Sequence, residues 1–370
     1  MVNASNKTAF NLFNQVLSSS ENNNTLISPL SIYIALAMVY NGANGKTADS
    51  IAKVLEMEGI SIDDLNATSK ALIEQLPAED NTVTLSVANS IWYRNEGMQP
   101  LASFLDIAKE NYKAEINPID FSNPSAVITI NNWVSVKTNG KIPGILENVD
   151  ASDLMYLINA IYFHGLWQHP FNTSDTYTDI FHAANKEVST SFMSQEVSIP
   201  NISNDKFDMV ELPYGTGKAF SMYILLPVNA NETINQFYTT LDESTIENAI
   251  ADMQVSTKTL IIPKWEYSFA LEDLKKTLTA MGMGIAFSDT ADFSNLYTGK
   301  VEITKAIHKT FIKVDEEGTE AAAATAIGIG VGAALPSPPF KADHPFLYII
   351  AEKQTGIILF MGTVNDPSEN

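Results

Sequence analysis

The stretch from Val314 to Phe340 limits the fold of this chain more than any other part of the sequence. It begins with acids, continues as a run of alanine, glycine and threonine, and ends in a turn rich in proline and serine. Such a composition is typical of a flexible linker between domains. However, only thirty residues follow, and their apolar runs Phe346–Ile350 and Gly356–Gly362 predict buried strands, too few to form a domain alone. We therefore expect a loop inside a domain, with both ends anchored in sheets.

The same stretch alternates as a strand does. Every second residue is small or β-branched, namely Thr319, Ala321, Ala323, Thr325, Ile327, Ile329 and Val331. The intervening residues are small, with one charge at Glu320. This pattern predicts a strand with one buried face, although alanine and glycine have low strand propensity. A segment that is able to form a strand but is weakly committed to it is expected to exist in two states.

Composition bounds the class of protein. With 370 residues, of which 45% are hydrophobic, the chain suffices for a large core, and the lack of any earlier linker favours a single domain over residues 1–370. A net charge of -21 argues against nucleic acid and anionic membranes as partners. There is no cysteine, so cysteine-based metal sites and nucleophiles are excluded. No signal segment or eighteen-residue apolar run is present, so we expect a cytoplasmic protein or one whose leader was removed.

The remaining sequence mixes helical and strand patterns without regular βαβ alternation. Ser28 and Pro29 predict a helix cap before a helix that is apolar nearly all round. Asp153–Phe163 predicts a central strand covered on both faces. Strands are also expected over Leu260–Tyr267 and Ile303–Val314, the latter running directly into the loop.

No sequence motif supports an enzyme. The patterns of zinc proteases, α/β-hydrolases, P-loops and dinucleotide-binding folds are all missing, and the five histidines are scattered. We therefore expect no catalytic residues, no metal and no cofactor.

The chain resembles the serpins, inhibitors that trap serine proteases by conformational change. Nine collinear segments carry the resemblance, including LINAIYFHGLW, AIHKTFIKVDEEGTEAAAAT and ADHPFLYIIAEKQTGIILFMGTVNDP. The resemblance implies an α+β fold with three β-sheets, eight or nine helices and an exposed reactive-centre loop at about residues 316–340. A protease attacks the loop as a substrate, and the cleaved loop then inserts as a new strand into the large sheet.

The resemblance assigns roles within the loop. The hinge comprises Glu316, Glu317, Gly318, Thr319, Glu320, Ala321, Ala322, Ala323 and Ala324, and its glycine, threonine and alanines match the inhibitory pattern. Counting sixteen residues from Glu316 gives Gly332–Ala333 as the scissile bond, with Val331 and Ala334 as alternative positions. No Lys or Arg lies between Lys313 and Lys341, so elastase-like or subtilisin-like proteases are expected as targets and trypsin-like ones are not.

Two clusters elsewhere also follow from the resemblance. Ser28, Ser31, Asn159 and His308 match the shutter, a buried polar network under the centre of the large sheet. Trp167, Lys264 and Glu316 match the breach, where the loop first enters. A Lys264–Glu316 ion pair at the surface would contribute little. Phe171, Asn131 and Trp133 are expected to serve core packing only.

The expected partner is a serine protease, and the chain is expected to be a monomer. The helix near Ile60–Leu76 has a single base, so no heparin activation is expected. The expected location is extracellular or in the cell envelope if a leader was removed, with the cytoplasm as the alternative. A non-inhibitory serpin that acts as a carrier or chaperone is the alternative function, and an unrelated enzyme or structural domain is a third.

Overall fold

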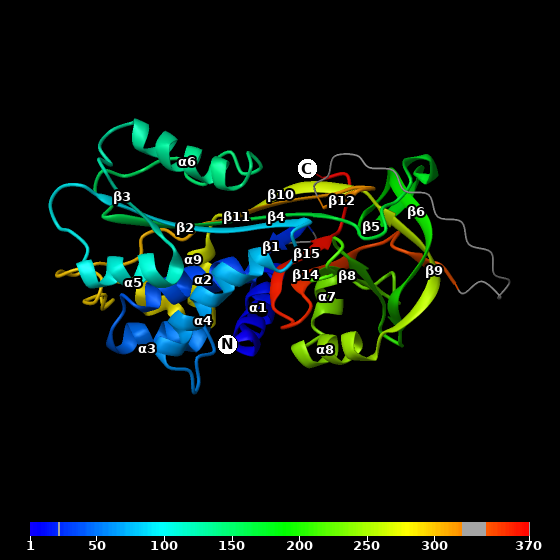
Figure 1. The fold of residues 1–370 in the computed structure, drawn as a ribbon, viewed down its shortest axis with the longest axis horizontal. Helices are drawn as coiled ribbons and strands as arrows, with labels where there is room; N and C mark the ends of the chain where they lie inside the picture. Colours follow the sequence, from blue (N-terminus) through cyan, green and yellow to red (C-terminus); the bar gives the residue numbers. More distant parts are fainter. Residues whose placement is uncertain (21–22, 320–337, 370) are drawn as a thin grey trace.

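The computed structural model describes residues 1–20, 23–319 and 338–369 and shows the expected mixture of helices and mostly antiparallel strands. A six-stranded sheet runs through one half of the molecule and a larger, twisted sheet forms the other half (Figure 1). Within the described residues the α-helices are α1 (Val2–Leu17), α2 (Pro29–Tyr40), α3 (Gly45–Val54), α4 (Ile62–Gln75), α5 (Ala102–Tyr112), α6 (Ser125–Lys137), α7 (Ile234–Tyr238), α8 (Glu243–Asp252) and α9 (Leu274–Leu278).

Both faces of the six-stranded sheet are covered. Helix α6 lies on one face, and α1 to α5 together with α9 lie on the other (Figure 1). In spatial order, the strands are β10 (Trp265–Leu271), β11 (His308–Val314), β12 (Gly318–Thr319), β4 (Met155–Leu166), β2 (Val83–Arg94) and β3 (Glu115–Ile119).

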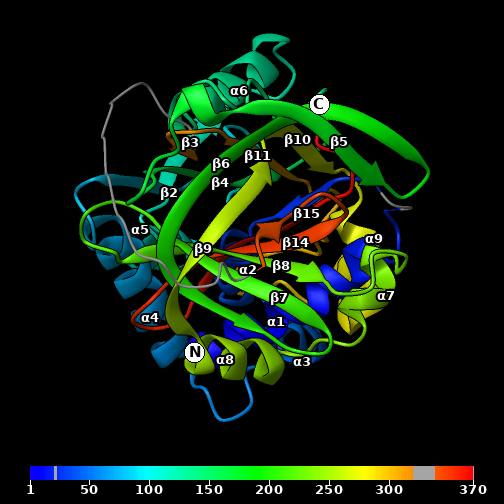
Figure 2. The same ribbon diagram turned by 90° about the vertical axis from the view of Figure 1, so that its right-hand side faces the viewer.

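Nine strands form the second sheet, which is strongly twisted (Figure 2). The 18-residue strand β6 pairs with β5 and β9 along most of its length and with β7 only at its last three residues, so it joins two blocks of strands. The three sheets expected from the resemblance are therefore connected into two hydrogen-bonded networks. The strands are β1 (Thr25–Ile27), β15 (Ile358–Val364), β14 (Phe346–Glu352), β8 (Phe220–Pro227), β7 (Phe207–Pro213), β6 (Lys186–Ser203), β9 (Gln254–Pro263), β13 (Phe340–Lys341) and β5 (Tyr177–Ala183).

Helix α2 lies at the centre of the core, as its sequence predicted. The side chain of Ser28 accepts a hydrogen bond from the Ser31 N–H at 3.3 Å, and Pro29 occupies the first helical position. All twelve residues of α2 except Ala35 and Tyr40 are buried. The helix therefore fixes Ser28 and Ser31 directly beneath the six-stranded sheet.

Two of the expected strands are different in the structure. The run Leu260–Tyr267 is divided at Lys264, because β9 ends at Pro263 in one sheet and β10 begins at Trp265 in the other. Only the second part of Ile303–Val314 is a strand. Pairing with β10 ends at His308, opposite Leu271, and in the described part of the chain no strand pairs with residues 303–307.

Candidate functional site: the slot between β4 and β11

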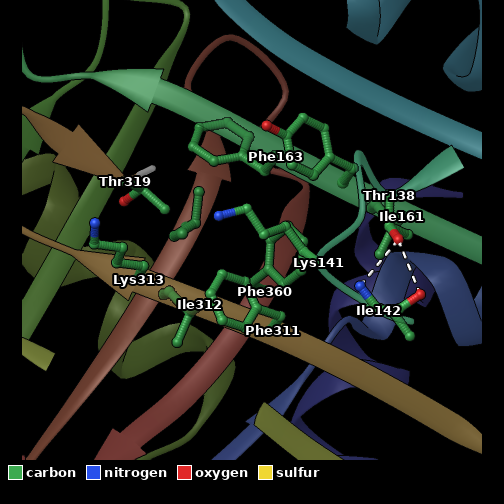
Figure 3. A pocket seen from close by; sticks show the side chains of 12 residues that line it. Thr138, Lys141, Ile142, Ile161, Phe163, Phe311, Ile312, Lys313, Thr319 and Phe360 are labelled. Carbon is green, nitrogen blue, oxygen red and sulfur yellow. Dashed lines mark hydrogen bonds between the residues drawn. The ribbon is translucent and has the colours of Figure 1, made fainter. Parts of the chain in front are cut away.

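The six-stranded sheet is open between two of its central strands. Within residues 1–20, 23–319 and 338–369, strands β4 and β11 are joined only through β12. Its two residues pair with Leu166 and Gly165 on β4, and Thr319 alone pairs with Val314 on β11. Beyond β12, no pairing between β4 and β11 occurs in the part of the chain that the structure describes. Figure 3 shows the resulting cleft, which we call the slot, with Thr319 at one end and Phe163, Ile312 and Phe311 along its walls.

Thr319 fills the upper end of the slot. Its side chain is 3% exposed, and its hydroxyl lies 2.6 Å from the Tyr214 hydroxyl. Tyr214 is itself wholly buried and stacks on Trp167 with ring centroids 4.6 Å apart. Burial raises the pKa of Tyr214 well above its usual range, so this phenol stays neutral and able to donate. The first inward-facing residue of the predicted strand is thus already held in the sheet.

Gly318 precedes it in a position where only glycine fits. A Cβ atom there would overlap the carbonyl oxygen of Gly165 and approach the Cα of Leu166 to 2.8 Å. The Gly318 carbonyl also accepts a hydrogen bond from the Asp315 N–H at 3.0 Å. The close approach of two backbones explains why this hinge position carries no side chain.

The three residues assigned to the breach lie together around the hinge. The Trp167 indole donates to the Asp315 carbonyl at 3.0 Å, and its backbone N–H donates to the Glu317 carbonyl at 2.8 Å. Lys264 lies 2.9 Å from a Glu316 carboxylate oxygen, and the Thr176 hydroxyl donates to the other at 2.8 Å. Every residue from 315 to 317 is therefore tied to the rim of the slot.

The Lys264–Glu316 pair is more buried than a surface ion pair. The Glu316 side chain is 9% exposed, whereas that of Lys264 is 39% exposed. Burial opposes ionisation of Glu316, but the hydrogen bonds from Lys264 and Thr176 outweigh this penalty and lower its pKa. Glu316 is therefore a charged anchor. Glu317 differs, because one of its carboxylate oxygens is buried and has no partner among the described residues.

The four residues assigned to the shutter also meet beneath the slot. The Ser28 N–H donates to His308 Nε2 at 3.0 Å, and the Ser28 hydroxyl donates to the Leu359 carbonyl at 2.8 Å. The Ser31 hydroxyl donates to the Asn159 side-chain carbonyl. These contacts connect α2 to β4, β11 and β15, so the network spans both sides of the slot.

Desolvation of the buried His308 side chain lowers its pKa to about 4, so the ring is neutral near pH 7. Since Nε2 accepts a hydrogen bond, the ring proton is on Nδ1. The Asn159 amide donates to Asn89 on β2 at 2.7 Å, which extends the network one strand further. Sequence patterns gave no sign of Asn89, because this contact joins residues seventy positions apart.

The segment of residues 138–146, which follows α6 and which we call the cover, lies over the slot on the face opposite the shutter. Asn131 accepts hydrogen bonds from the Ile145 and Leu146 N–H groups, each at 2.9 Å, and donates to the Leu146 carbonyl at 2.7 Å. Asn131 is thus a polar clamp, and the expectation that it serves core packing only was wrong. Lys141, in the same segment, places its ammonium 5.1 Å from the centre of the Phe311 ring at the slot (Figure 3).

Trp133 also has a polar role, whereas the Phe171 side chain packs in the core as expected. The Trp133 indole donates to a Glu115 carboxylate oxygen at 2.8 Å. Phe171 is buried, and its backbone N–H donates to the Glu316 carbonyl at 2.8 Å.

Several predicted site residues lie outside the described residues. They are the remaining hinge residues Glu320, Ala321, Ala322, Ala323 and Ala324 and the candidate cleavage positions Val331, Gly332, Ala333 and Ala334. Among residues 1–20, 23–319 and 338–369, no group of His, Asp or Glu side chains is arranged to hold a metal ion. No helix in these same ranges has the length and apolarity that crossing a bilayer requires.

Comparison with known proteins identifies the family. The family model described as "Serpin (serine protease inhibitor)" matches residues 3–367, so the chain belongs to the serpins. The leukocyte elastase inhibitor of Xenopus laevis is 35% identical, with 97% of each chain covered. The crystal structure of tengpin, a thermophilic serpin in its native state, superimposes with a TM-score of 0.89 at 34% identity, covering 99% of this chain and 94% of tengpin. Human thyroxine-binding globulin complexed with its ligand gives 0.90 at 27% identity, covering 100% and 99%.

Proposed function

We propose that this protein inhibits a serine protease as a suicide substrate, and that its cleaved reactive-centre loop inserts into the slot as a full strand. The observation that carries the proposal is β12. Thr319, the first residue of the predicted strand, already pairs with both β4 and β11, and the slot continues beyond it. The similarity to a leukocyte elastase inhibitor supports the same function.

The register of β12 predicts where each inserted residue would lie. Thr319 pairs with Gly165 on β4 and with Val314 on β11, and both pairings are antiparallel. Six residues further along the loop is Thr325, and six residues back along the two strands are Asn159 and His308. The inserted Thr325 hydroxyl would thus meet the two shutter side chains that face each other across the slot.

The same register agrees with the alternation in the sequence. In antiparallel pairs, directly opposed side chains point to the same face of the sheet. Ala321 would lie between Phe163 and Ile312, which are both buried. Glu320, on the opposite face, would lie beside Lys313. The small residues would therefore enter the core, and the acid would stay outside it.

The energy available from insertion is large. About a dozen new backbone hydrogen bonds, at a net 0.5–1.5 kcal/mol each, would contribute roughly 10–20 kcal/mol before opposing terms. At about 3.3 Å per residue, the insertion would carry the end of the strand, with a protease attached, over a distance on the order of 50 Å. Such a displacement is sufficient to pull the acylated protease across the length of the sheet.

The test uses pancreatic elastase and subtilisin, whose pockets accept small residues. We expect an SDS-resistant one-to-one complex with at least one of them, release of a C-terminal peptide that begins at Ala333, and no complex with trypsin. Complexes with neither protease, although the loop is cleaved, would contradict inhibition.

A thermal measurement separates the alternatives. The similarity to a globulin solved with thyroxine bound supports a non-inhibitory carrier as the second candidate. A large rise in melting temperature after loop cleavage without complex formation would favour that candidate, because it shows insertion without trapping. If loop cleavage leaves the melting temperature unchanged, the result would contradict a loop that exists in two states.

Regulation and location are also part of the proposal. Helix α4 carries Lys70 as its single base, and we propose that no glycosaminoglycan activates the inhibitor. We propose a site of action outside the cytoplasm, where proteases of these classes act. A heparin titration of the inhibition rate and fractionation of the source cells test the two points.

A further inference from the structure

A second cavity lies where the slot widens toward its far end, and in the uncleaved protein no step of the proposed inhibition uses it. Its volume is about 320 Å³, within the range of small-molecule sites of about 300–1,000 Å³. It is bounded by α2, by the first five residues of β4, by α9 and by residues 301–308. Leu36, Leu157, Leu278, Phe287 and Ile303 are among the apolar side chains that line it.

The inner end of the cavity is polar and offers donors. His308 lines the cavity, and because its Nε2 accepts the hydrogen bond from the Ser28 N–H, Nδ1–H is the ring group left to donate to a ligand. Asn159, which also lines the cavity, uses one of its two amide hydrogens on Asn89. A ligand that supplies an acceptor to these two donors is therefore favoured over one that covers them with apolar atoms, because covering would leave them unpaired.

The charges around the cavity exclude an anion. Asp153 and Glu302 both line it, and they are half-buried and exposed, respectively, whereas His308 is buried. The one lysine there, Lys305, donates to the Asn148 side-chain carbonyl at 3.0 Å and lies 5.9 Å from the centre of the Tyr156 ring. A carboxylate ligand would therefore meet like charge at the entrance and neutral donors within. A neutral carbonyl oxygen satisfies the same donors without this repulsion.

We propose that this cavity binds a neutral, largely apolar small molecule whose carbonyl oxygen accepts hydrogen bonds from His308 and Asn159. The site is a property of the uncleaved protein and does not depend on protease inhibition. Its consequence for inhibition does rest on the proposed function: the ligand would occupy the far end of the slot and hinder the last part of loop insertion.

The binding test uses prodan, a neutral naphthyl ketone whose fluorescence shifts to the blue in apolar surroundings. Titration of the full-length protein is expected to show saturable one-to-one binding. Ala35, on α2, lines the cavity and is only half-buried, so Ala35→Phe fills the space and is expected to weaken binding at least about tenfold. The matched control is Ala52→Phe on α3, which is also half-buried but lies outside the cavity and should bind normally.

A second arm tests the donors. A naphthalene with a propyl group in place of the propionyl group lacks the acceptor and is expected to bind roughly fivefold to tenfold more weakly. Near-ultraviolet circular dichroism confirms that each variant is folded. The proposal is overturned if the wild-type protein shows no saturable binding, if Ala35→Phe binds as tightly as Ala52→Phe, or if the anionic probe anilinonaphthalene sulfonate binds and prodan does not.

These outcomes are independent of inhibition. If prodan binds but no protease complex forms, the cavity proposal stands and the inhibitory one fails. If both hold, saturating prodan is expected to raise the number of inhibitor molecules consumed per protease, because slower insertion allows more of the acyl-enzyme to hydrolyse.

Discussion

Thr319→Arg is the substitution that most directly tests the slot. The Thr319 side chain is 3% exposed and its hydroxyl bonds to the buried Tyr214 hydroxyl. Arginine removes that bond, which leaves a buried phenol unpaired at a cost of about 1–3 kcal/mol. It also forces a guanidinium toward the core, where an unpaired charge costs several kcal/mol.

The two costs together are roughly 5 kcal/mol or more, so the substituted side chain is expected to leave the slot in the uncleaved protein and would have to be buried again at the start of insertion. Because each 1.4 kcal/mol of barrier changes a rate about tenfold, insertion should slow by roughly a thousandfold or more. Hydrolysis of the acyl-enzyme does not depend on Thr319, so it should overtake insertion. We therefore expect the variant to be cleaved as a substrate.

The assay is the number of inhibitor molecules consumed per protease molecule, together with the yield of SDS-resistant complex. Thr178→Arg is the matched control, because it makes the same chemical change at an exposed position on β5 and should trap normally. Undiminished covalent trapping by Thr319→Arg would refute the reasoning. An equal loss of trapping by Thr178→Arg would also refute it, because an added positive charge would then impair trapping from a position outside the slot.

Four further predictions follow from the hinge, the shutter and the cover. Gly318→Ala should expel β12, because its Cβ has no space against β4, and hydrogen–deuterium exchange of residues 314–319 should rise without a change in global stability. Glu316→Gln should weaken the contacts of the hinge with the slot by about 1–2 kcal/mol. Because the folded pKa of Glu316 is lowered, the stabilisation by this carboxylate is present above about pH 4.5 and is lost as the pH falls further. Unchanged protection of residues 314–319 from hydrogen–deuterium exchange on acidification would contradict this prediction. His308 has a pKa of about 4 in the folded protein against 6.5 in the unfolded chain, so between these pH values the unfolded state binds more protons. The free energy of unfolding should therefore fall by about 3 kcal/mol as the pH falls from 6.5 to 4. Urea unfolding of His308→Gln should lack this pH dependence. Asn131→Ala removes three hydrogen bonds from the cover and should shorten the half-life of inhibitory activity on warming, whereas the exposed neighbour Asn132→Ala should not.

Local sequence patterns predicted the elements whose conformation and burial depend mainly on their own residues. The Ser28–Pro29 pair specifies a cap and a first turn, and the apolar run of Asp153–Phe163 specifies a strand covered on both faces, as β4 is. The division at Lys264 could not be predicted in this way. Strand-forming residues continue on both sides of it, and the change of sheet depends on distant partners of β9 and β10.

The contacts that define the site were also beyond local patterns. Tyr214 and Thr319 are 105 positions apart, and nothing near Tyr214 indicates that its hydroxyl receives the hinge. Asn131 lies on α6, and nothing in its neighbours indicates that its amide holds backbone groups fourteen and fifteen residues away. The shutter and breach residues could be named only through the family resemblance, because their spacing in sequence carries no pattern.

The position of β12 bears on which step controls insertion. A strand that enters a closed sheet must first separate two paired neighbours, which loses their hydrogen bonds before new ones form. Here Thr319, the first residue of the new strand, already pairs with both β4 and β11, and beyond it these strands have no mutual pairing within the described residues. Breaking a ladder therefore contributes little to the barrier. The remaining obstacles are the cover held by Asn131 and the polar network of Asn159 and His308, which must accept a new side chain at its centre. The rate of trapping should accordingly respond more to substitutions in the cover and the shutter than to substitutions along the walls of the slot.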